Sequence, residues 1–276
     1  MIDFIHGILH RYAAHFAIAS YFIVFIILLK IRSVKLSRSW FVPLFALYFG
    51  VSFASLFAIF LDGPESSRIL SKNSIFVLIL DAFNPKNSMG KVMYGGYFGS
   101  IAGIWLANFI SKHKSFSELL DISAISWSLF LFIWRIGCFV NGCCYGRPSD
   151  TFGFSFPEGT NAFSLLRKTD LVVGNATVPL LPTQLISASG NLAIFMFLLI
   201  LFCKNKMRYP YFYFFAQMFL YGTGRFIIEF FRIDPREFWG PLSMSQWISV
   251  VLVAWSLVFF IKNRKEIFKS FSKQNR

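Results

Sequence analysis

The chain has 276 residues, of which 56% are hydrophobic and only 14% are charged. A soluble domain of this length needs far more charged surface, so the composition excludes a soluble globular protein and indicates an integral membrane protein. The net charge of +14 is explained by cytoplasmic loops and by attraction to anionic lipids, and we expect no nucleic-acid partner.

Seven apolar stretches are long enough to cross a bilayer as helices, which takes about 17–25 residues. A further run at 75–83 is too short to cross and is expected to lie at the interface or to re-enter the membrane. The sequence therefore predicts an all-α polytopic membrane protein with seven transmembrane helices, forming a single membrane domain over 1–276. The seven stretches are 13–29, 41–61, 92–110, 120–140, 183–203, 211–231 and 245–261.

Basic residues set the expected orientation of these helices. More than half of the 27 lysines and arginines follow the first, third, fifth and seventh stretches. The positive-inside rule makes that side cytoplasmic. We therefore expect a multi-pass protein of the bacterial inner membrane with its N-terminus outside and its C-terminus in the cytoplasm. Residues 141–182 are expected to form a small periplasmic head, in which the alternating "TFGFSF" at 151–156 predicts one short strand.

The third stretch opens with paired glycines. Gly99 and Gly103 have the G-x-x-x-G spacing that is typical of close helix packing. Gly95 and Gly96 precede them and predict a flexible helix entrance, where Tyr94 would present its hydroxyl at the depth of the lipid headgroups.

An arginine lies near the outer end of the fourth stretch. Arg135 is followed by the loop "NGCCYG", whose Gly142 and Gly146 allow backbone amides to approach a ligand closely. Ionisable residues at this depth are costly and usually face protein or water. Arg135 therefore either extends to the outer headgroups, as arginines near helix ends readily do, or belongs to a binding site.

The four cysteines are Cys138, which precedes this loop, Cys143 and Cys144, which lie within it, and Cys203. Their spacing matches no zinc pattern and no histidine lies nearby, so we expect neither a metal nor a cofactor. On an oxidising outer face Cys138 pairs with Cys143 or Cys144, or else the small thiols fill a tight turn. Both interpretations remain open.

The sixth stretch carries a polar stripe. Gln217, Tyr221, Arg225 and Glu229 recur every four residues and share one helical face, with Arg232 on the same side. The stripe is either an internal Arg225–Glu229 ion pair that neutralises the helix or the lining of a wet cavity. Because guanidinium groups match phosphate oxygens bidentately, arginines of two helices near one leaflet predict a phospholipid headgroup site.

These motifs resemble those of the prolipoprotein diacylglyceryl transferase family. "RIGCFVNGCCYGRPSD" is similar to the family's R-I-G-N-F-x-N-x-E-x-x-G, and "YGTGRFIIEFFRID" to its Y-G-x-x-R-F-x-x-E-F-x-R. "KVMYGGYFGSIAG" resembles the family's G-G helix entrance, and "LPTQLISA" its H-P-x-Q-L-Y-E. The resemblance covers about Lys91 to Trp247, with the motifs in the family's order.

The resemblance implies transfer of diacylglycerol from phosphatidylglycerol to the cysteine thiol of a lipoprotein precursor. The implied partners are phosphatidylglycerol, the signal peptides of lipoprotein precursors and membrane lipids, and we expect a monomer. The expected catalytic residues are Arg135, Arg225, Tyr94 and Glu229. The expected substrate-binding residues are Arg135, Arg225, Gly96, Gly146, Tyr221, Asn141 and Arg232.

Four positions depart from the family's pattern. Tyr94 and Leu181 stand where the family has histidines, Cys138 replaces an asparagine and Cys143 a glutamate. A histidine is a competent base for a thiol at neutral pH, whereas a tyrosine is not. Either nearby arginines offset this handicap by favouring the charged phenolate, or Tyr94 donates a hydrogen bond to phosphate and the base lies elsewhere, with His15 as a candidate.

Two other functions stay open at this point. A divergent member of the family would use the same phospholipid donor on a different acceptor, which the changes at Tyr94, Cys138 and Cys143 favour. A non-catalytic seven-span receptor or carrier is the second alternative. The stretch 245–261 holds no lysine for retinal, and the inverted repeats and broken helices of many carriers are not evident.

Overall fold

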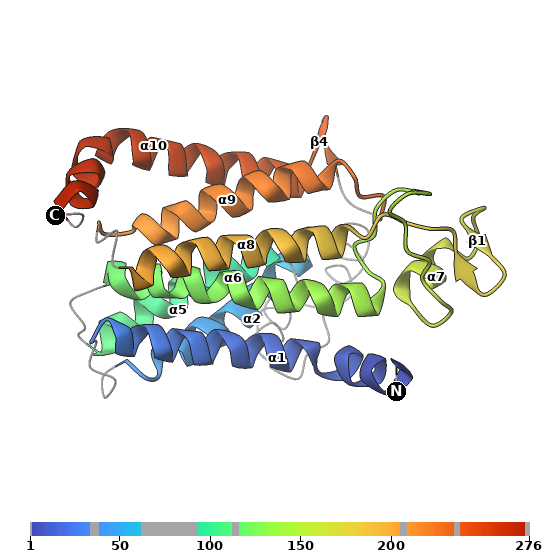
Figure 1. Ribbon diagram of the computed structural model, residues 1–276, viewed down its shortest axis with the longest axis horizontal. Coiled ribbons are helices and arrows are strands. Elements are labelled where there is room, and N and C mark those ends of the chain that lie inside the picture. The colour runs from blue at the N-terminus through green and yellow to red at the C-terminus, as the bar shows by residue number, and fades with distance from the viewer. Residues whose placement is uncertain are drawn as a thin grey trace.

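The computed structural model describes residues 2–33, 39–61, 93–111, 116–204, 209–234 and 238–273. Among these residues, seven long helices run along a common axis and form a bundle (Figure 1). Each coincides with one of the predicted apolar stretches, whereas the short run at 75–83 lies outside the described residues. The helices are α1 (Ile2–Ile31), α2 (Val42–Leu61), α5 (Met93–Ser111), α6 (Phe116–Asn141), α8 (Thr183–Cys203), α9 (Phe212–Glu229) and α10 (Met244–Lys273).

Within the described residues, four of these helices are both long and apolar enough to cross a membrane. These segments are Tyr12–Ile31, Phe116–Asn141, Thr183–Cys203 and Met244–Ser272, and Val42–Phe57 is a shorter apolar segment. The protein is therefore a helical, polytopic membrane protein. α10 continues past the predicted stretch 245–261 and ends at Lys273. Its additional residues form a basic, mostly exposed tail.

Helix α6 lies at the centre of the bundle and packs against α1, α5, α8 and α9. Its serines are buried but satisfied: Ser126 and Ser128 donate to carbonyl oxygens one turn earlier, at 2.9 and 3.1 Å. The hydroxyls of Tyr21 in α1 and Ser123 in α6 lie 2.7 Å apart. These polar groups of α1 and α6 are thus paired within or between helices, as an apolar solvent requires.

The close packing predicted for the G-x-x-x-G spacing is confirmed between α2 and α5. A Cβ atom on Gly99 would lie 2.2 Å from the carbonyl oxygen of Phe49, and one on Gly103 would lie 2.4 Å from that of Phe45. Gly95 makes a similar contact inside the first turn of α5. That glycine therefore serves packing rather than a flexible entrance.

Residues 141–182 form a head segment beyond one end of the bundle (Figure 1). It contains α7 (Asn161–Leu166), β1 (Val172–Val173) and β2 (Ala176–Thr177) around a small core of its own. The N-terminus lies at the same end as the head, and the C-terminus lies at the opposite end. A second hairpin, β3 (Phe238–Trp239) and β4 (Leu242–Ser243), leads into α10.

The strand predicted at 151–156 is wrong. Residues 150–152 turn, and Phe154 alone pairs, in an isolated bridge with Leu180. The chain folds back closely here, because a Cβ atom on Gly153 would lie 2.1 Å from the carbonyl oxygen of Ser149. Pro157, just beyond the stretch, has no N–H to extend a ladder.

Candidate active site

A cavity of about 250 Å³ opens between α8 and α9, toward the head end of the bundle. Arg135 of α6 and Arg225 of α9 both line it. Much of the remaining lining is apolar, with Ile186 and Ile194 from α8, and Tyr221 contributes from α9. Two arginines from different helices therefore line one largely apolar chamber, and guanidinium groups are well suited to binding a phosphate.

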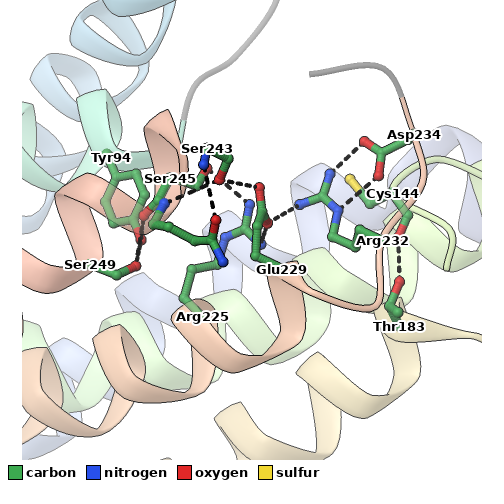
Figure 2. A network of polar contacts seen from close by, with 11 residues as sticks. Tyr94, Cys144, Thr183, Arg225, Glu229, Arg232, Asp234, Ser243, Ser245 and Ser249 are labelled. Atoms are coloured by element: carbon green, nitrogen blue, oxygen red, sulfur yellow. Dashed lines mark hydrogen bonds and ion pairs between the residues drawn. The ribbon is translucent and has the colours of Figure 1, made fainter. Parts of the chain in front are cut away.

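The polar stripe on α9 ends in a closed network of ion pairs and hydrogen bonds (Figure 2). Arg225 forms an ion pair with Oε2 of Glu229, and Nη1 of Arg232 lies 3.3 Å from the same oxygen. Ser243 donates to Oε1 of Glu229 at 2.9 Å, and Arg225 donates to Ser245 at 3.1 Å. The ion pair predicted for the stripe is therefore confirmed, and Arg225 also lines the cavity, whose walls are largely apolar.

Arg232 forms ion pairs with two neighbouring carboxylates. Its Nε and Nη2 donate to the two carboxylate oxygens of Asp234 at 2.9 and 2.6 Å, in a bidentate pair. Burial lowers the pKa of Arg232. The neighbouring Cys144 and Asp234 raise this pKa by more than burial lowers it, so it lies above its ordinary value. Arg232 is thus a permanent cation beside the cavity rather than in its lining.

Arg135 contrasts with both of these arginines. It is only 6% exposed, so it does not extend to the headgroups. Among the residues that the structure describes, Arg135 forms no ion pair and its Nε has no hydrogen-bond partner. The hydroxyl of Tyr221, which lines the same cavity, also lacks a partner there. A buried cation without an anion is unfavourable, so an anionic ligand in the cavity would stabilise this arrangement.

The loop after α6 brings three thiols together. The Sγ atoms of Cys138, Cys143 and Cys144 all lie within 4.8 Å of one another, and all three thiols are free. The loop turns back through positive φ angles at Gly142 (66°) and Cys144 (61°), and Cys143 N–H donates to the carbonyl oxygen of Cys138 at 3.1 Å. The sequence spacing alone did not predict this cluster.

The first turn of α8 fixes this loop from the other side. Gln184 donates to the carbonyl oxygen of Cys143 at 2.7 Å, and Thr183 donates to that of Cys144. Gly146 N–H donates to Leu181, and a Cβ atom on Gly146 would lie 2.7 Å from a methyl group of Thr183. Gly146 therefore allows the loop to pack on α8. The motif "LPTQLISA" was the signal for these contacts, although their role as loop supports was not predicted.

Tyr94 and Gly96 lie outside the arginine-lined cavity. The hydroxyl of Tyr94 lies 2.7 Å from the hydroxyl of Ser249 in α10 (Figure 2). The ring of Tyr221 packs against the ring of Tyr94, with centroids 6.3 Å apart. Gly96 lines a separate apolar cavity of about 180 Å³, together with Trp127. The structure therefore brings Arg135, Tyr221 and Arg225 to one cavity but not these two residues.

Three further residues of the region are more exposed. Asn141 ends α6 and is half-buried, and His15 is exposed on α1 beside the ring of Tyr12. Arg147 is exposed as well, and its guanidinium lies over the ring of Phe231 at 5.2 Å. None of the three lines the arginine cavity.

Fold and site together define a polytopic membrane protein with buried guanidinium groups around an apolar cavity. The model of the prolipoprotein diacylglyceryl transferase family matches residues 2–262, so the chain belongs to this family. It is 35% identical over 182 residues to phosphatidylglycerol–prolipoprotein diacylglyceryl transferase 2 of Clostridium perfringens, covering 64% of this chain and 65% of that protein.

Two further relatives carry the name phosphatidylglycerol–prolipoprotein diacylglyceryl transferase. The protein of Clostridium tetani is 32% identical over 62% of this chain and 63% of its own length. The protein of Oleidesulfovibrio alaskensis is 30% identical over 77% of this chain and 76% of its own length. The chain spans slightly less than two thirds of the two clostridial relatives.

Proposed function

We propose that this protein transfers the diacylglyceryl group of phosphatidylglycerol to the cysteine thiol of a prolipoprotein and releases glycerol phosphate. Family membership and the names of the relatives support this activity. The observation that carries the proposal is Arg135, a buried cation without an ion pair among the described residues, on the same cavity as Arg225. The phosphate of a phospholipid supplies the missing anion, and its acyl chains suit the apolar walls.

In the proposed reaction the acceptor thiolate attacks the glycerol carbon that bears the phosphate. A C–S bond forms, the C–O bond breaks, and the electron pair leaves with the phosphate oxygen. Negative charge grows on the phosphate, and Arg135 stabilises it because the guanidinium is already in place. Glu229 holds Arg225 in position, Tyr221 donates its free hydroxyl to the phosphate, and Arg232 adds positive potential nearby.

The remaining candidates take lesser roles in this proposal. Asn141 and Gly146 shape the loop that borders the phosphate, and Gly96 shapes the neighbouring apolar cavity. Tyr94 supports the site through Ser249 and the ring of Tyr221.

The proposal includes an orientation in the bacterial inner membrane. We infer one membrane domain over 1–276, with seven spans, the N-terminus and head in the periplasm and a cytoplasmic C-terminus, acting as a monomer. The arrangement of the N-terminus and head at one end, and of the basic tail of α10 at the other, supports it. A membrane-impermeant maleimide added to whole cells should label Ser164→Cys in the head but leave the native Cys203 unlabelled until the membrane is permeabilised.

The activity is tested with purified protein, phosphatidylglycerol vesicles and a peptide that carries a lipoprotein signal cysteine. Mass spectrometry should detect a thioether-linked diacylglyceryl product with this peptide and none with its Cys→Ser counterpart. The variant Arg135→Gln should lose the product, whereas Arg147→Gln, which changes an exposed arginine close by, should retain it. Absence of product from wild-type protein, where the C. perfringens relative forms it, contradicts the proposal.

A second candidate function keeps the phospholipid donor but uses another acceptor. The position of Tyr94 favours it, because the residue that replaces the family's histidine bonds to Ser249 outside the cavity. Complementation of cells depleted of the standard transferase by the unmodified protein would exclude this candidate. Lipoprotein activity gained only by Tyr94→His would support it.

A further inference from the structure

The three-thiol cluster (Cys138, Cys143, Cys144) has the dimensions of a metal site. Its Sγ atoms already lie within 4.8 Å of one another. Zinc–sulfur bonds of about 2.3 Å place the sulfurs of a tetrahedral site about 3.8 Å apart, so the thiols need to approach by no more than about 1 Å. Cys138 is buried, while Cys143 and Cys144 are half-buried, which leaves one side of the cluster accessible.

The cluster is held in place by the surrounding fold. Cys138 belongs to the last turn of α6, and Gln184 and Thr183 of α8 bind the carbonyl groups of the other two cysteines. These contacts fix the backbone of the cysteines, so the sulfur atoms lie close together before a metal ion binds. Hydrogen bonds around the direct ligands are a general requirement of metal sites.

Two arginines lie near the cluster. Arg135 interacts electrostatically with all three cysteines, and Arg232 interacts with Cys144, beside which Figure 2 places it. A metal ion binds cysteine as the thiolate. One zinc ion and three thiolates together carry a single negative charge. Arg135 and Arg232 are the cations beside this charge.

We propose that the three-thiol cluster binds a zinc ion whose fourth position takes the sulfur of the acceptor cysteine. Zinc held by three protein ligands keeps an open position for a substrate, and a thiol that coordinates zinc is deprotonated. The inference rests on the proposed function for the identity of the acceptor. It supplies the thiol activation that Tyr94, bonded to Ser249 away from the cavity, does not provide.

The zinc-bound sulfur then performs the transfer. The acceptor S–H proton passes to water on coordination, and the sulfur electron pair forms the C–S bond to the glycerol carbon. The C–O bond to phosphate breaks, and its electron pair leaves with glycerol phosphate. The product is a neutral thioether, a weaker ligand than a thiolate, so the modified protein dissociates. Arg135 adjoins both the cluster and the cavity, and one cation therefore serves both the nucleophile and the leaving group.

Metal content tests the cluster without reference to activity. Protein purified in detergent under reducing conditions should hold about one zinc per chain by elemental analysis. Cys144→Ser should lower zinc retention at least tenfold against a competing chelator. The matched control is Cys203→Ser, because Cys203 is an exposed cysteine at the far end of α8 and should leave zinc unchanged. Wild-type protein without zinc, with copper instead, or with a disulfide between these cysteines in its active form overturns the proposal.

Cobalt substitution tests the fourth ligand. The Co²⁺-loaded protein should show a sulfur-to-cobalt charge-transfer band that grows when the lipoprotein signal peptide is added. The Cys→Ser peptide should leave the band unchanged, and an equal response to both peptides overturns the fourth-ligand assignment. Transfer activity that survives complete removal of zinc refutes the inference but leaves the proposed function standing. A cluster that binds zinc and the peptide thiol without any transfer refutes the proposed function instead.

Discussion

The head ends of α9 and α6 each carry buried positive charge, but they compensate it differently. On α9, Arg225 and Arg232 share Glu229, and Asp234 and two serines complete the network. On α6, Arg135 has no ion pair within the described residues. The fold neutralises the first group by itself, whereas in the proposed function a ligand neutralises the second. The comparison therefore separates charges that stabilise the protein from a charge that is available for binding.

The largest expected effect is on activity, at the unpaired arginine. Arg135→Gln should lower kcat for diacylglyceryl transfer by about 10²–10³-fold, as loss of one group that stabilises developing negative charge typically does. The thermal midpoint in detergent should not fall, because no ion pair within the described structure is broken. Turnover measurements and thermal unfolding of the same preparation check both expectations.

The same variant shows whether the ligand of Arg135 is the lipid. Phosphatidylglycerol should raise the thermal midpoint of wild-type protein through preferential binding to the folded state, and Arg135→Gln should abolish that increase. Arg147→Gln, the exposed control, should keep it. A thermal midpoint that drops in Arg135→Gln without lipid would mean that the fold, rather than a ligand, compensates this charge.

For the ion-paired arginines, Arg225 and Arg232, we expect the opposite outcome, which is a loss of stability. Glu229→Gln leaves Arg225 and Arg232 without their shared carboxylate, and breaking a buried ion pair costs about 3–5 kcal/mol of stability. We expect a marked fall in the thermal midpoint, together with reduced expression. Asp234→Asn removes only the outer, bidentate partner of Arg232 and should have a smaller effect. Equal stability of Glu229→Gln and wild type would contradict the network as a stabilising element.

The helices of the bundle could be predicted from sequence because each contains a long apolar run, and within the described residues four of them are long and apolar enough to cross a membrane. α8 begins and ends where the stretch 183–203 does. The head was less predictable, since its short elements depend on contacts distant in sequence. Phe154 pairs with Leu180 rather than with a neighbouring strand, and a regular alternation at 151–156 did not reveal this.

The site was predictable in its charges but not in their partners. The four-residue spacing on α9 placed Arg225 and Glu229 together, because helix geometry fixes that distance. The three-thiol cluster escaped prediction, since it depends on positive φ angles at Gly142 and Cys144 rather than on a ligand spacing. The sequence also gave no indication that the Tyr94 hydroxyl bonds to Ser249 of α10 instead of facing the cavity.

A substitution in the wall of the cavity tests whether Arg135 and Arg225 share one ligand. Gly224 lines the cavity, and a Cβ atom there would have no neighbour within 4 Å among the described residues. Gly224→Val should displace about two methylene groups of lipid at about 0.8 kcal/mol each, which raises KM for phosphatidylglycerol roughly tenfold. Stability should be nearly unchanged.

The matched control places the same side chain in a packed position. Gly99→Val should destabilise the α2–α5 contact, because the added Cβ would lie 2.2 Å from the carbonyl oxygen of Phe49. Its effect should be on the thermal midpoint and not on KM. An unchanged KM in Gly224→Val would indicate that the two arginines bind separate groups.

The smallest effects are expected from two tyrosines, one whose hydroxyl has a hydrogen-bond partner and one whose hydroxyl has none within the described residues. The Tyr94 hydroxyl is bonded to Ser249, so Tyr94→Phe should cost about 1 kcal/mol of stability and leave kcat nearly unchanged. The Tyr221 hydroxyl has no partner within the described residues, so Tyr221→Phe should leave stability unchanged and lower kcat several-fold. Loss of activity in Tyr94→Phe without loss of stability would assign Tyr94 to the chemistry and reverse this ranking. Paired polar groups would then also serve the reaction, and the distinction between stabilising and available groups would hold for the arginines alone.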